Sequence, residues 1–424
     1  MSFAAKHITV FEHETIRVNQ VVDGCRFENS HLEALQQFFG KQGVPYYQLV
    51  HNGVKFSEYV GIIQVGNLTI NVLPKADKSC IYTSDSVAKR KWNNMLIGML
   101  NAVGHFDIHA PSSSVLSLNN NSILDLYCEL FVSELEQLIH RGLVKKYRQT
   151  EGNSNALKGR LIFSRNIQIN LVHKEKFYVS HTIYDTKHLF HSILYKALVL
   201  VNRINHNPLL QSKINGLLID FPEMQDVKVT QDTFSRINYD RKTESYRNAL
   251  KIARLILLNY HPDLVNGSND VLALMFDMNL LWERFVFVSL KRNKGKDWTV
   301  KAQNSKNFWK NESGKSSRIK PDILINQGLE SCIVLDTKWK NLNGKSPSPD
   351  DLKQMYVYQK YYHTNKVALI YPGSTNSAIK GTYYDEHTGH LNNKQCSIIS
   401  LEPNDNIYHW QSNIVDVISD WMDM

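Results

Sequence analysis

Residues 318–340 read RIKPDILINQGLESCIVLDTKWK and contain two short apolar runs, each with an aspartate at one end. Asp322 precedes ILI, and Asp336 follows CIVL. Short apolar runs rich in β-branched residues are typical of buried strands. Because side chains alternate between the two faces of a strand, Asp336 and Lys338 share one face and Thr337 lies on the other. If the two strands pair, we expect Asp322 and Asp336 to converge.

Two converging carboxylates form a suitable site for a hard divalent cation. Mg²⁺ prefers oxygen ligands and keeps several waters, so Asp322, Asp336 and a scissile phosphate would complete its shell, with Mn²⁺ as a substitute. The ion would lower the pKa of bound water and neutralise charge developing on phosphorus. Lys338 would orient the nucleophile and stabilise the transition state. The alternative interpretation is a pair of exposed carboxylates at strand ends, with Lys338 as a solvated neighbour.

Polar residues in the flanking segments favour the metal interpretation. Glu283 lies in the apolar helical pattern NLLWERFVFV, where a half-buried carboxylate is costly unless it is paired or bound to a cation. Gln354 and Tyr358 are four residues apart in a predicted helix over 348–363, capped by Ser348, and therefore share a face. Gln303 ends the strand-like run 298–303 and is a further candidate, although an exposed polar position explains it equally well.

The chain as a whole has the pattern of an α+β multidomain protein. Alternating β-branched residues, broken by Gly66, predict a β-rich region over 1–84, and apolar spacings of three and four predict a mainly helical region over 85–265. After residue 266, a long helical pattern over 269–292 precedes an α/β core with a mixed sheet. The elements expected there are strands at 298–303, 318–325 and 331–340, the helix 348–363, a strand at 366–372, a hairpin over 381–402 and a closing helix at 413–422.

Positive charge is concentrated just before the two aspartates. Of the net charge of +9 in 424 residues, residues 291–320 carry ten basic and two acidic side chains. A basic stripe indicates a phosphate-rich partner, although solvated lysine-rich loops are common. We expect a group of basic residues to contact the DNA backbone together, namely Lys301, Lys306, Lys310, Lys315, Arg318 and Lys320. Core packing is the better expectation for the neighbouring aromatic residues Trp298, Phe308, Trp309 and Trp339.

Several other classes of function lack their sequence signals. No apolar run approaches the length of a membrane span, and the first residues lack an export leader, so we expect no membrane association and a cytoplasmic location. The five cysteines contain no CxxC, which predicts reduced thiols. The Gly-Lys-Ser triplets at 314–316 and 344–346 have tryptophan where a phosphate-binding loop needs its first glycine. We therefore expect this chain to bind no nucleotide, and any nucleotide hydrolysis to come from another chain.

The ordered set of a helix glutamate, Pro-Asp, Asp-x-Lys and Gln-x-x-x-Tyr resembles the PD-(D/E)XK nuclease superfamily, in the branch with a QxxxY motif. The resemblance implies an αβββαβ core. It also implies catalytic roles for Glu283, Asp322, Asp336 and Lys338, with metal binding by the two aspartates. Gln354, Tyr358 and Gln303 would support them.

Longer segments resemble one nuclease family within that superfamily. FDMNLLWERFV, RIKPDILI, IVLDTKWK, YVGIIQVGNLTINVLPKAD and NALKGRLIF are similar to the McrC subunits of McrBC-type and LlaJI-type restriction systems, over about residues 59–372. Trp282 stands where we expect Phe, and His191 where such chains often have Asn. The resemblance implies an endonuclease that cleaves foreign or modified double-stranded DNA. It also implies a McrB-like AAA+ GTPase oligomer as partner, whose GTP hydrolysis this chain would stimulate.

Two other functions remain open from the sequence. One is a self-contained RecB-like nuclease that needs no motor, which the long N-terminal part disfavours. The other is an adaptor that activates a motor and has only weak nuclease activity. We expect the partner surface within residues 1–84.

Overall fold

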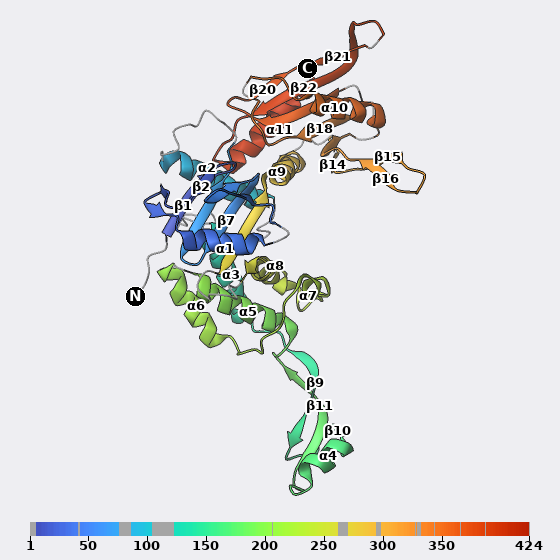
Figure 1. Cartoon of the computed structure of the whole chain (residues 1–424). Helices are drawn as coiled ribbons and strands as arrows, with labels where there is room; N and C mark the ends of the chain where they lie inside the picture. The colour runs from blue at the N-terminus through green and yellow to red at the C-terminus, as the bar shows by residue number, and fades with distance from the viewer. Residues whose placement is uncertain are drawn as a thin grey trace. The chain divides into compact units, whose positions relative to one another are not determined.

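The computed structural model describes residues 6–40, 43–75, 86–103, 123–205, 207–261, 270–293, 298–326, 328, 332–342, 344–364, 366–385 and 387–423. The chain divides into two compact units. The first comprises Met1–Ala5 and Ala110–Pro262, and the second comprises Lys6–His109 and Asp263–Met424. Figure 1 colours the chain from blue to red, so the second unit includes both the blue N-terminal and the red C-terminal elements. The boundaries expected at 84/85 and 265/266 remain a prediction.

The N-terminal part of the second unit is built on a sheet in which β1 (Lys6–Phe11), β8 (Leu68–Leu73), β7 (Tyr59–Val65) and β13 (Val271–Asp277) lie side by side in that order. The turn predicted at Gly66 connects β7 to β8, and Gly66 adopts a positive φ of 56°. Smaller elements flank the sheet: β2 (Thr15–Arg17), β3 (Val21–Val22), β4 (Cys25–Arg26), α1 (Asn29–Phe39), β5 (Tyr47–Val50) and β6 (Gly53–Phe56).

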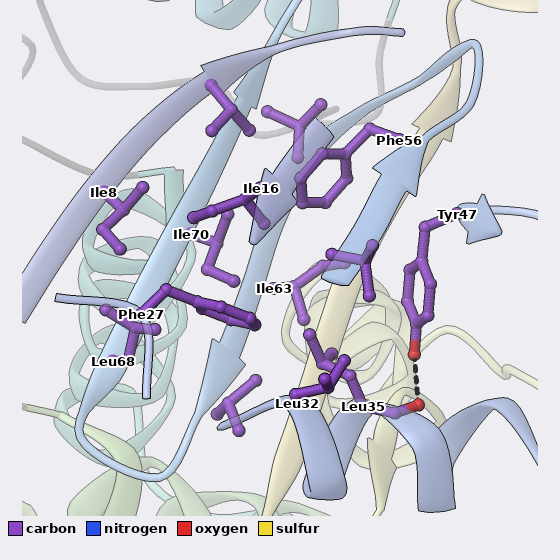
Figure 2. Close-up of a cluster of buried hydrophobic side chains, with 14 of the residues drawn as sticks. Ile8, Ile16, Phe27, Leu32, Leu35, Tyr47, Phe56, Ile63, Leu68 and Ile70 are labelled. Atoms are coloured by element: carbon purple, nitrogen blue, oxygen red, sulfur yellow. Dashed lines mark hydrogen bonds between the residues drawn. The ribbon is translucent and has the colours of Figure 1, made fainter. Parts of the chain in front are cut away.

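A hydrophobic core joins this sheet to its flanking elements. Ile63 and Ile70 from the sheet pack with Phe27 and with Leu35 of α1, as Figure 2 shows. The Tyr47 hydroxyl donates a hydrogen bond of 2.7 Å to the Leu35 carbonyl oxygen, so β5 is fixed against α1. The β-rich character predicted for residues 1–84 is therefore confirmed for the residues described there.

The long helix predicted over 269–292 is wrong in its first third. Residues Val271–Asp277 form β13, which pairs antiparallel with β7, and the helix α9 begins only at Met278 and ends at Asn293. A short apolar run such as VLALMF fits a buried strand as well as a buried helix, and periodicity alone does not separate them. This segment forms a strand because it pairs with β7, which lies more than two hundred residues away in the chain.

The C-terminal part of the second unit is a mixed sheet, as predicted. Its strands are β14 (Val300–Ala302), β17 (Ile323–Ile325), β18 (Ile333–Thr337), β19 (Lys366–Pro372), β22 (Leu391–Leu401) and β20 (Ser377–Ile379), in that spatial order, with β21 (Thr382–Tyr384) also on β22. Pairing is antiparallel from β14 to β18 and parallel from β18 to β22. A separate hairpin of β15 (Lys306–Lys310) and β16 (Ser316–Ile319) follows β14.

Helices pack on this sheet and on each other. The helix α10 (Pro349–Tyr362) contributes Met355, Tyr358 and Tyr362 to a core with Val334 and Val367 of the sheet. The helices α9 and α11 (Ile407–Asp423) pack on one another and contact β18 and β22, respectively. The helix α2 (Ser86–Ala102) packs on α9. Figure 1 shows α10 and α11 with the orange and red strands.

The first unit is mainly helical, as predicted for the middle of the chain, but it also contains a long hairpin. Its helices are α3 (Ile123–His140), α4 (Phe163–Asn170), α5 (Leu189–Ile204), α6 (Pro208–Asp220), α7 (Gln231–Ser235), a 3-10 helix (Glu244–Tyr246) and α8 (Arg247–Leu258). The hairpin consists of β9 (Lys146–Ser154) and β11 (Phe177–Asp185), with β10 (Arg160–Leu161) on β11; β12 is Tyr260–His261. Figure 1 shows α4 and β10 at one end of this hairpin.

The described residues include four of the five cysteines and all the helices named above. Cys25, Cys128, Cys332 and Cys396 are free thiols, and Cys80 lies outside the described residues. Of the helices in the described part of the chain, none has the length and apolar composition that crossing a membrane requires.

A buried histidine gives the first unit a pH-dependent stability. His191 is fully buried, with Nδ1 2.6 Å from the Thr186 carbonyl oxygen and Nε2 2.9 Å from the Tyr246 hydroxyl. Burial, with a smaller effect from neighbouring His188, lowers the pKa of His191 from 6.5 to about 4. The unfolded chain therefore binds a proton near pH 6.5 that the folded chain accepts only near pH 4. The contribution of neutral His191 to folding stability is therefore fully present above pH 6.5 and is lost as the pH falls through this window.

We predict that the free energy of unfolding of the wild type falls by about 3 kcal/mol more than that of His191→Asn between pH 6.5 and pH 4, since each pKa unit corresponds to about 1.4 kcal/mol. Urea unfolding at a series of pH values measures this difference. Using the variant as reference subtracts the titration of other groups. Parallel pH dependences in the two proteins would contradict the assignment of the lost stability to His191.

Candidate active site

The two aspartates of the sequence motif lie on neighbouring strands. β17 and β18 pair antiparallel, with Ile323 opposite Leu335, so Asp322 just before β17 comes next to the end of β18. The Asp322 Oδ2 atom accepts hydrogen bonds from the backbone N–H and the hydroxyl of Thr337, at 2.7 and 2.8 Å. Thr337 therefore holds the Asp322 carboxylate in one orientation. Strand alternation in the sequence predicts that Thr337 faces away from Asp336, but it does not predict that Thr337 anchors the Asp322 carboxylate.

Asp336 is buried beside the lysine of the same motif. Its exposed fraction is 1%, and Nζ of Lys338 lies 2.8 Å from its Oδ2. Burial and then the charge of Asp322 raise the pKa of Asp336 to about 7, although Lys338 opposes both. Burial lowers the pKa of Lys338, but the charge of Asp336 outweighs this and raises it above its ordinary value. The pair thus combines a carboxyl group that resists ionisation with a lysine that stays charged.

Gln354 and Tyr358 approach the site from α10. The helix begins where the sequence predicts, because the Ser348 side chain accepts a hydrogen bond of 3.1 Å from the Asp351 N–H. Oε1 of Gln354 accepts a hydrogen bond of 3.4 Å from the Lys338 ammonium, and its Nε2 donates one of 2.7 Å to the Tyr358 hydroxyl. Tyr358 in turn donates a hydrogen bond of 3.1 Å to the Lys320 carbonyl oxygen. These contacts connect the helix to both motif strands.

Gln303 connects Glu283 to the same site. Its Nε2 donates a hydrogen bond of 2.6 Å to Oε1 of Glu283, and its Oε1 accepts one of 3.0 Å from the Lys320 ammonium. Its backbone N–H donates to the Asp322 carbonyl oxygen, at 3.0 Å. Gln303 has a φ of 51°, a left-handed conformation that is uncommon for a residue with a side chain and often found at functional sites. Burial, followed by the charge of Asp322, raises the pKa of Glu283.

The carboxylates of this site have the chemistry of a cation site. Among the described residues, the buried Oδ2 of Asp336 has no well-directed hydrogen bond, although the Lys338 ammonium lies close to it. Burial first, and then the charge of Asp322, raise the pKa of Asp336, and a divalent ion between the two carboxylates would favour their ionised forms. Within the described residues, no group of three or more His, Cys, Asp or Glu side chains is arranged to hold a metal. An ion here would therefore take its remaining ligands from water and substrate, as Mg²⁺ usually does.

Lys301 lies on β14, and the other predicted DNA-contact residues lie on or next to the hairpin β15–β16. Lys301, Lys310, Lys315, Arg318 and Lys320 are exposed. Lys306 differs from them, because its ammonium donates a hydrogen bond of 2.6 Å to the Tyr361 carbonyl oxygen and lies 4.6 Å from the centre of the Tyr362 ring. Lys306 thus fastens the hairpin to α10.

Two aromatic residues of the hairpin correct an expectation from the sequence. Core packing is confirmed for Trp339, which is 7% exposed, and is partial for Trp298. It is wrong for Phe308 and Trp309, whose exposed fractions are 45% and 57%. β15 and β16 form a sheet of their own, and the Phe308 ring contacts the Tyr361 ring of α10, with ring centroids 5.4 Å apart, but stays partly exposed.

Comparisons with known proteins agree on one family. Residues 54–372 match the model of the family described as McrBC 5-methylcytosine restriction system component. The Type IV methyl-directed restriction enzyme EcoKMcrBC of Escherichia coli K12 is 20% identical over 256 residues, which cover 57% of this chain and 72% of the relative.

Solved structures share the fold. A chain of the half-complex from the tetradecameric assembly of Thermococcus gammatolerans McrB AAA+ hexamers with bound McrC aligns with a TM-score of 0.70 at 19% identity, covering 98% of this chain and all of that one. A chain of the Thermococcus gammatolerans McrBC complex aligns with a TM-score of 0.50 at 21% identity, covering 69% of this chain and 89% of that one.

Proposed function

Because the chain belongs to the family of McrBC 5-methylcytosine restriction system components, we propose that it is the Mg²⁺-dependent endonuclease subunit of such a system. The observation that carries the proposal is the convergence of Asp322 and Asp336 from adjacent strands, with the Lys338 ammonium 2.8 Å from Asp336. The order α9, β14, β17, β18, α10 and β19 supports a PD-(D/E)XK nuclease core, into which the hairpin β15–β16 is inserted.

Each residue of the site has a definite task in phosphodiester hydrolysis. Asp322 and Asp336 would hold the ion, which when bound supplies an acidified water and a charge that stabilises the transition state. Thr337 fixes the Asp322 carboxylate by its two hydrogen bonds. Lys338 stays positively charged, so it can orient the attacking water and stabilise negative charge on the phosphate. Gln354 keeps the Lys338 side chain directed toward the site.

Glu283 and Gln303 form the other side of the site. Gln303 bridges Glu283 and Lys320, and burial, followed by the charge of Asp322, raises the pKa of Glu283. Glu283 would accept a proton or hold a water of the ion, and Gln303 would keep it in place. This arrangement supports an enzyme in preference to an adaptor with an incidental site, since an adaptor needs no such set of oriented carboxylates.

The experiment that tests the proposal is DNA cleavage by the purified chain. The solved relative contains McrB AAA+ hexamers with bound McrC, so we propose a McrB-like AAA+ GTPase as partner of this chain. We expect cleavage of methylated double-stranded DNA when the chain, the partner, GTP and Mg²⁺ are all present, and none when EDTA replaces Mg²⁺. Efficient cleavage by the isolated chain would favour the RecB-like alternative. Protection against foreign DNA by a cleavage-deficient chain would favour the adaptor.

The hairpin β15–β16 supports contact with double-stranded DNA. A two-stranded β-ribbon fits the major groove, and this ribbon exposes Trp309, Lys310, Lys315 and Arg318. Lysine and arginine contacts to phosphate release counterions and make binding salt-dependent. The residues 301–320 therefore form the DNA-contact element that we propose, with Lys306 as its attachment to α10.

Two places on the chain are candidates for the partner surface. The prediction from sequence is residues 1–84, but deleting them would remove the strand β7 that pairs with β13 and would unfold the second unit. Within the first unit, large apolar side chains are exposed on α4 and the adjoining loop, namely Phe163, Ile167, Ile169, Leu171 and Val172. Exposed apolar patches of this kind are typical of interaction sites.

We predict that the double variant Phe163→Ser, Val172→Ser reduces stimulation of the partner's GTP hydrolysis at least about tenfold, since a few apolar anchors carry most of the energy of an interface. Substitution of exposed residues within 1–84, such as Val21→Ser and Leu49→Ser, gives the matched comparison. GTPase assays at increasing concentrations of the chain measure both. If the second pair and not the first abolishes stimulation, the surface lies within residues 1–84, as predicted from sequence.

A further inference from the structure

A buried carboxyl group connects the N-terminal sheet to the strand that carries Lys338. Glu12 follows β1 and is 1% exposed. Its Oε1 accepts hydrogen bonds from the indole N–H of Trp339, at 2.8 Å, and from the backbone N–H of Lys75, at 2.6 Å. Its own backbone N–H donates to the Leu73 carbonyl oxygen, at 2.9 Å. Glu12 thus joins the Leu-Pro-Lys turn after β8 to the residue that follows Lys338.

Trp339 is the second residue after β18. The last hydrogen bond of the strand runs from the Lys338 N–H to the Ile370 carbonyl oxygen, at 2.9 Å, and the chain then leaves β19. The position of Lys338 therefore depends on what holds Trp339. Its backbone N–H makes a long bond of 3.4 Å to Asn279, so the hydrogen bond of its indole to Glu12 is the shorter of the two.

The same indole packs on the residue that precedes Glu283. Trp339 packs edge-to-face on Trp282, with ring centroids 5.5 Å apart, and Trp282 directly precedes Glu283. Trp282 is fully buried and also stacks on Trp410 of α11. The rings of Trp339 and Trp282 consequently link the residues next to Lys338 and Glu283, and Glu12 fixes one end of this aromatic pair.

Packing alone does not account for a carboxyl group at this position. Burying a carboxyl group is costly unless hydrogen bonds compensate, and among the described residues Oε2 of Glu12 has no hydrogen-bond partner. Burial raises the pKa of Glu12 to about 7, against the effect of the two donors. A leucine would fill the same space without this cost, but it could not accept the two hydrogen bonds.

We propose that Glu12 is a positioning residue of the nuclease site, which through Trp339 holds Lys338, and through the Trp339–Trp282 contact holds Glu283, in the geometry needed for DNA cleavage. This inference rests on the proposed function. It adds a residue from the N-terminal sheet, far from the nuclease motifs in sequence, to the set on which cleavage depends.

The test compares the full-length chain with the variants Glu12→Leu, Glu12→Gln and Trp339→Phe, each with the partner GTPase, GTP, Mg²⁺ and methylated DNA. Glu12→Leu is expected to lower kcat for cleavage at least about tenfold, with KM for DNA and stimulation of the partner within about twofold of wild type, because misplacing a catalytic group affects the chemical step. Trp339→Phe keeps the ring but loses the N–H, and is expected to lower kcat to a similar extent.

Two further comparisons separate positioning from a general loss of structure. Glu12→Gln keeps the oxygen that accepts both hydrogen bonds, so kcat should stay within about threefold of wild type. The double variant Glu12→Leu, Trp339→Phe should be no slower than the worse single variant, since both remove one interaction. Glu14→Leu is the matched control, because Glu14 lies two residues away, accepts a hydrogen bond from the Phe11 N–H and pairs with the Lys75 ammonium, and makes none of the hydrogen bonds to Trp339.

The outcomes are distinct. Wild-type kcat in both Glu12→Leu and Trp339→Phe overturns the inference, and so does a Glu12→Gln variant as slow as Glu12→Leu. Equal loss of cleavage and of GTPase stimulation also overturns it, since this indicates damage to the fold. If Glu12→Leu does not fold, Trp339→Phe and Glu12→Gln decide. A wild-type chain that never cleaves DNA contradicts the proposed function itself.

Discussion

Asp336→Ala and Lys338→Ala are each expected to lower the rate of DNA cleavage at least about a thousandfold, while complex formation with the partner stays intact. In the proposed function, Asp336 is one of the two carboxylates that would hold the ion, and its removal would leave Asp322 alone. Lys338 is the ammonium closest to the Asp336 carboxylate, and no other group is placed to replace its charge among the described contacts of Asp336.

Single-turnover cleavage of methylated DNA with GTP and Mg²⁺ measures the effect. Lys340→Ala is the matched control for Lys338→Ala, because Lys340 is two residues further on and its ammonium pairs with Asp351, 2.6 Å away, and not with Asp336. Asp350→Ala is the matched control for Asp336→Ala, because Asp350 is at an exposed position. Cleavage at the wild-type rate by either site variant, or equal loss in the controls, would contradict the assignment of the site.

The geometry of the site followed from short-range rules. Strand alternation placed Asp336 with Lys338, and the pairing of two apolar runs brought Asp322 to them, as the structure has it. Helical spacing likewise placed Gln354 and Tyr358 on one face of α10, where they form a hydrogen bond. Such rules operate within one or two adjacent elements, and the sequence contains all the information that they require.

The features that escaped prediction depend on partners far away in the chain. β13 resembled the start of a helix because its apolar run is short, and only pairing with β7 makes it a strand. The hairpin β9–β11 was missed because KYRQTEGNS is polar, with half-buried and exposed residues in alternation and no apolar face to signal a strand. Glu12 gave no signal, since its partner Trp339 is 327 residues away.

Replacement of Asp336 by asparagine is expected to stabilise the metal-free protein and to remove its response to Mg²⁺. Without an ion, the Asp336 carboxylate is buried next to Asp322, and its raised pKa shows that Lys338 does not fully offset this. Asparagine keeps the shape and avoids the charge. We expect a gain on the order of 2 kcal/mol at pH 8, which corresponds to roughly 5 °C in the melting temperature of the second unit. Differential scanning calorimetry in EDTA measures it.

The same instrument tests the response to the ion. Mg²⁺ at ten times its Kd should stabilise the wild type by about 1.4 kcal/mol, because it binds only the folded site, whereas Asp336→Asn should not respond. Asp350→Asn, at an exposed position, should change neither quantity and is the control. A variant that melts below the wild type in EDTA, yet still gains stability with Mg²⁺, would show that the ion does not depend on Asp336. Melting temperatures report metal binding separately from catalysis. Burial, followed by the charge of Asp322, disfavours the ionised Asp336 carboxylate without an ion, so its replacement by asparagine should stabilise the fold while it abolishes cleavage.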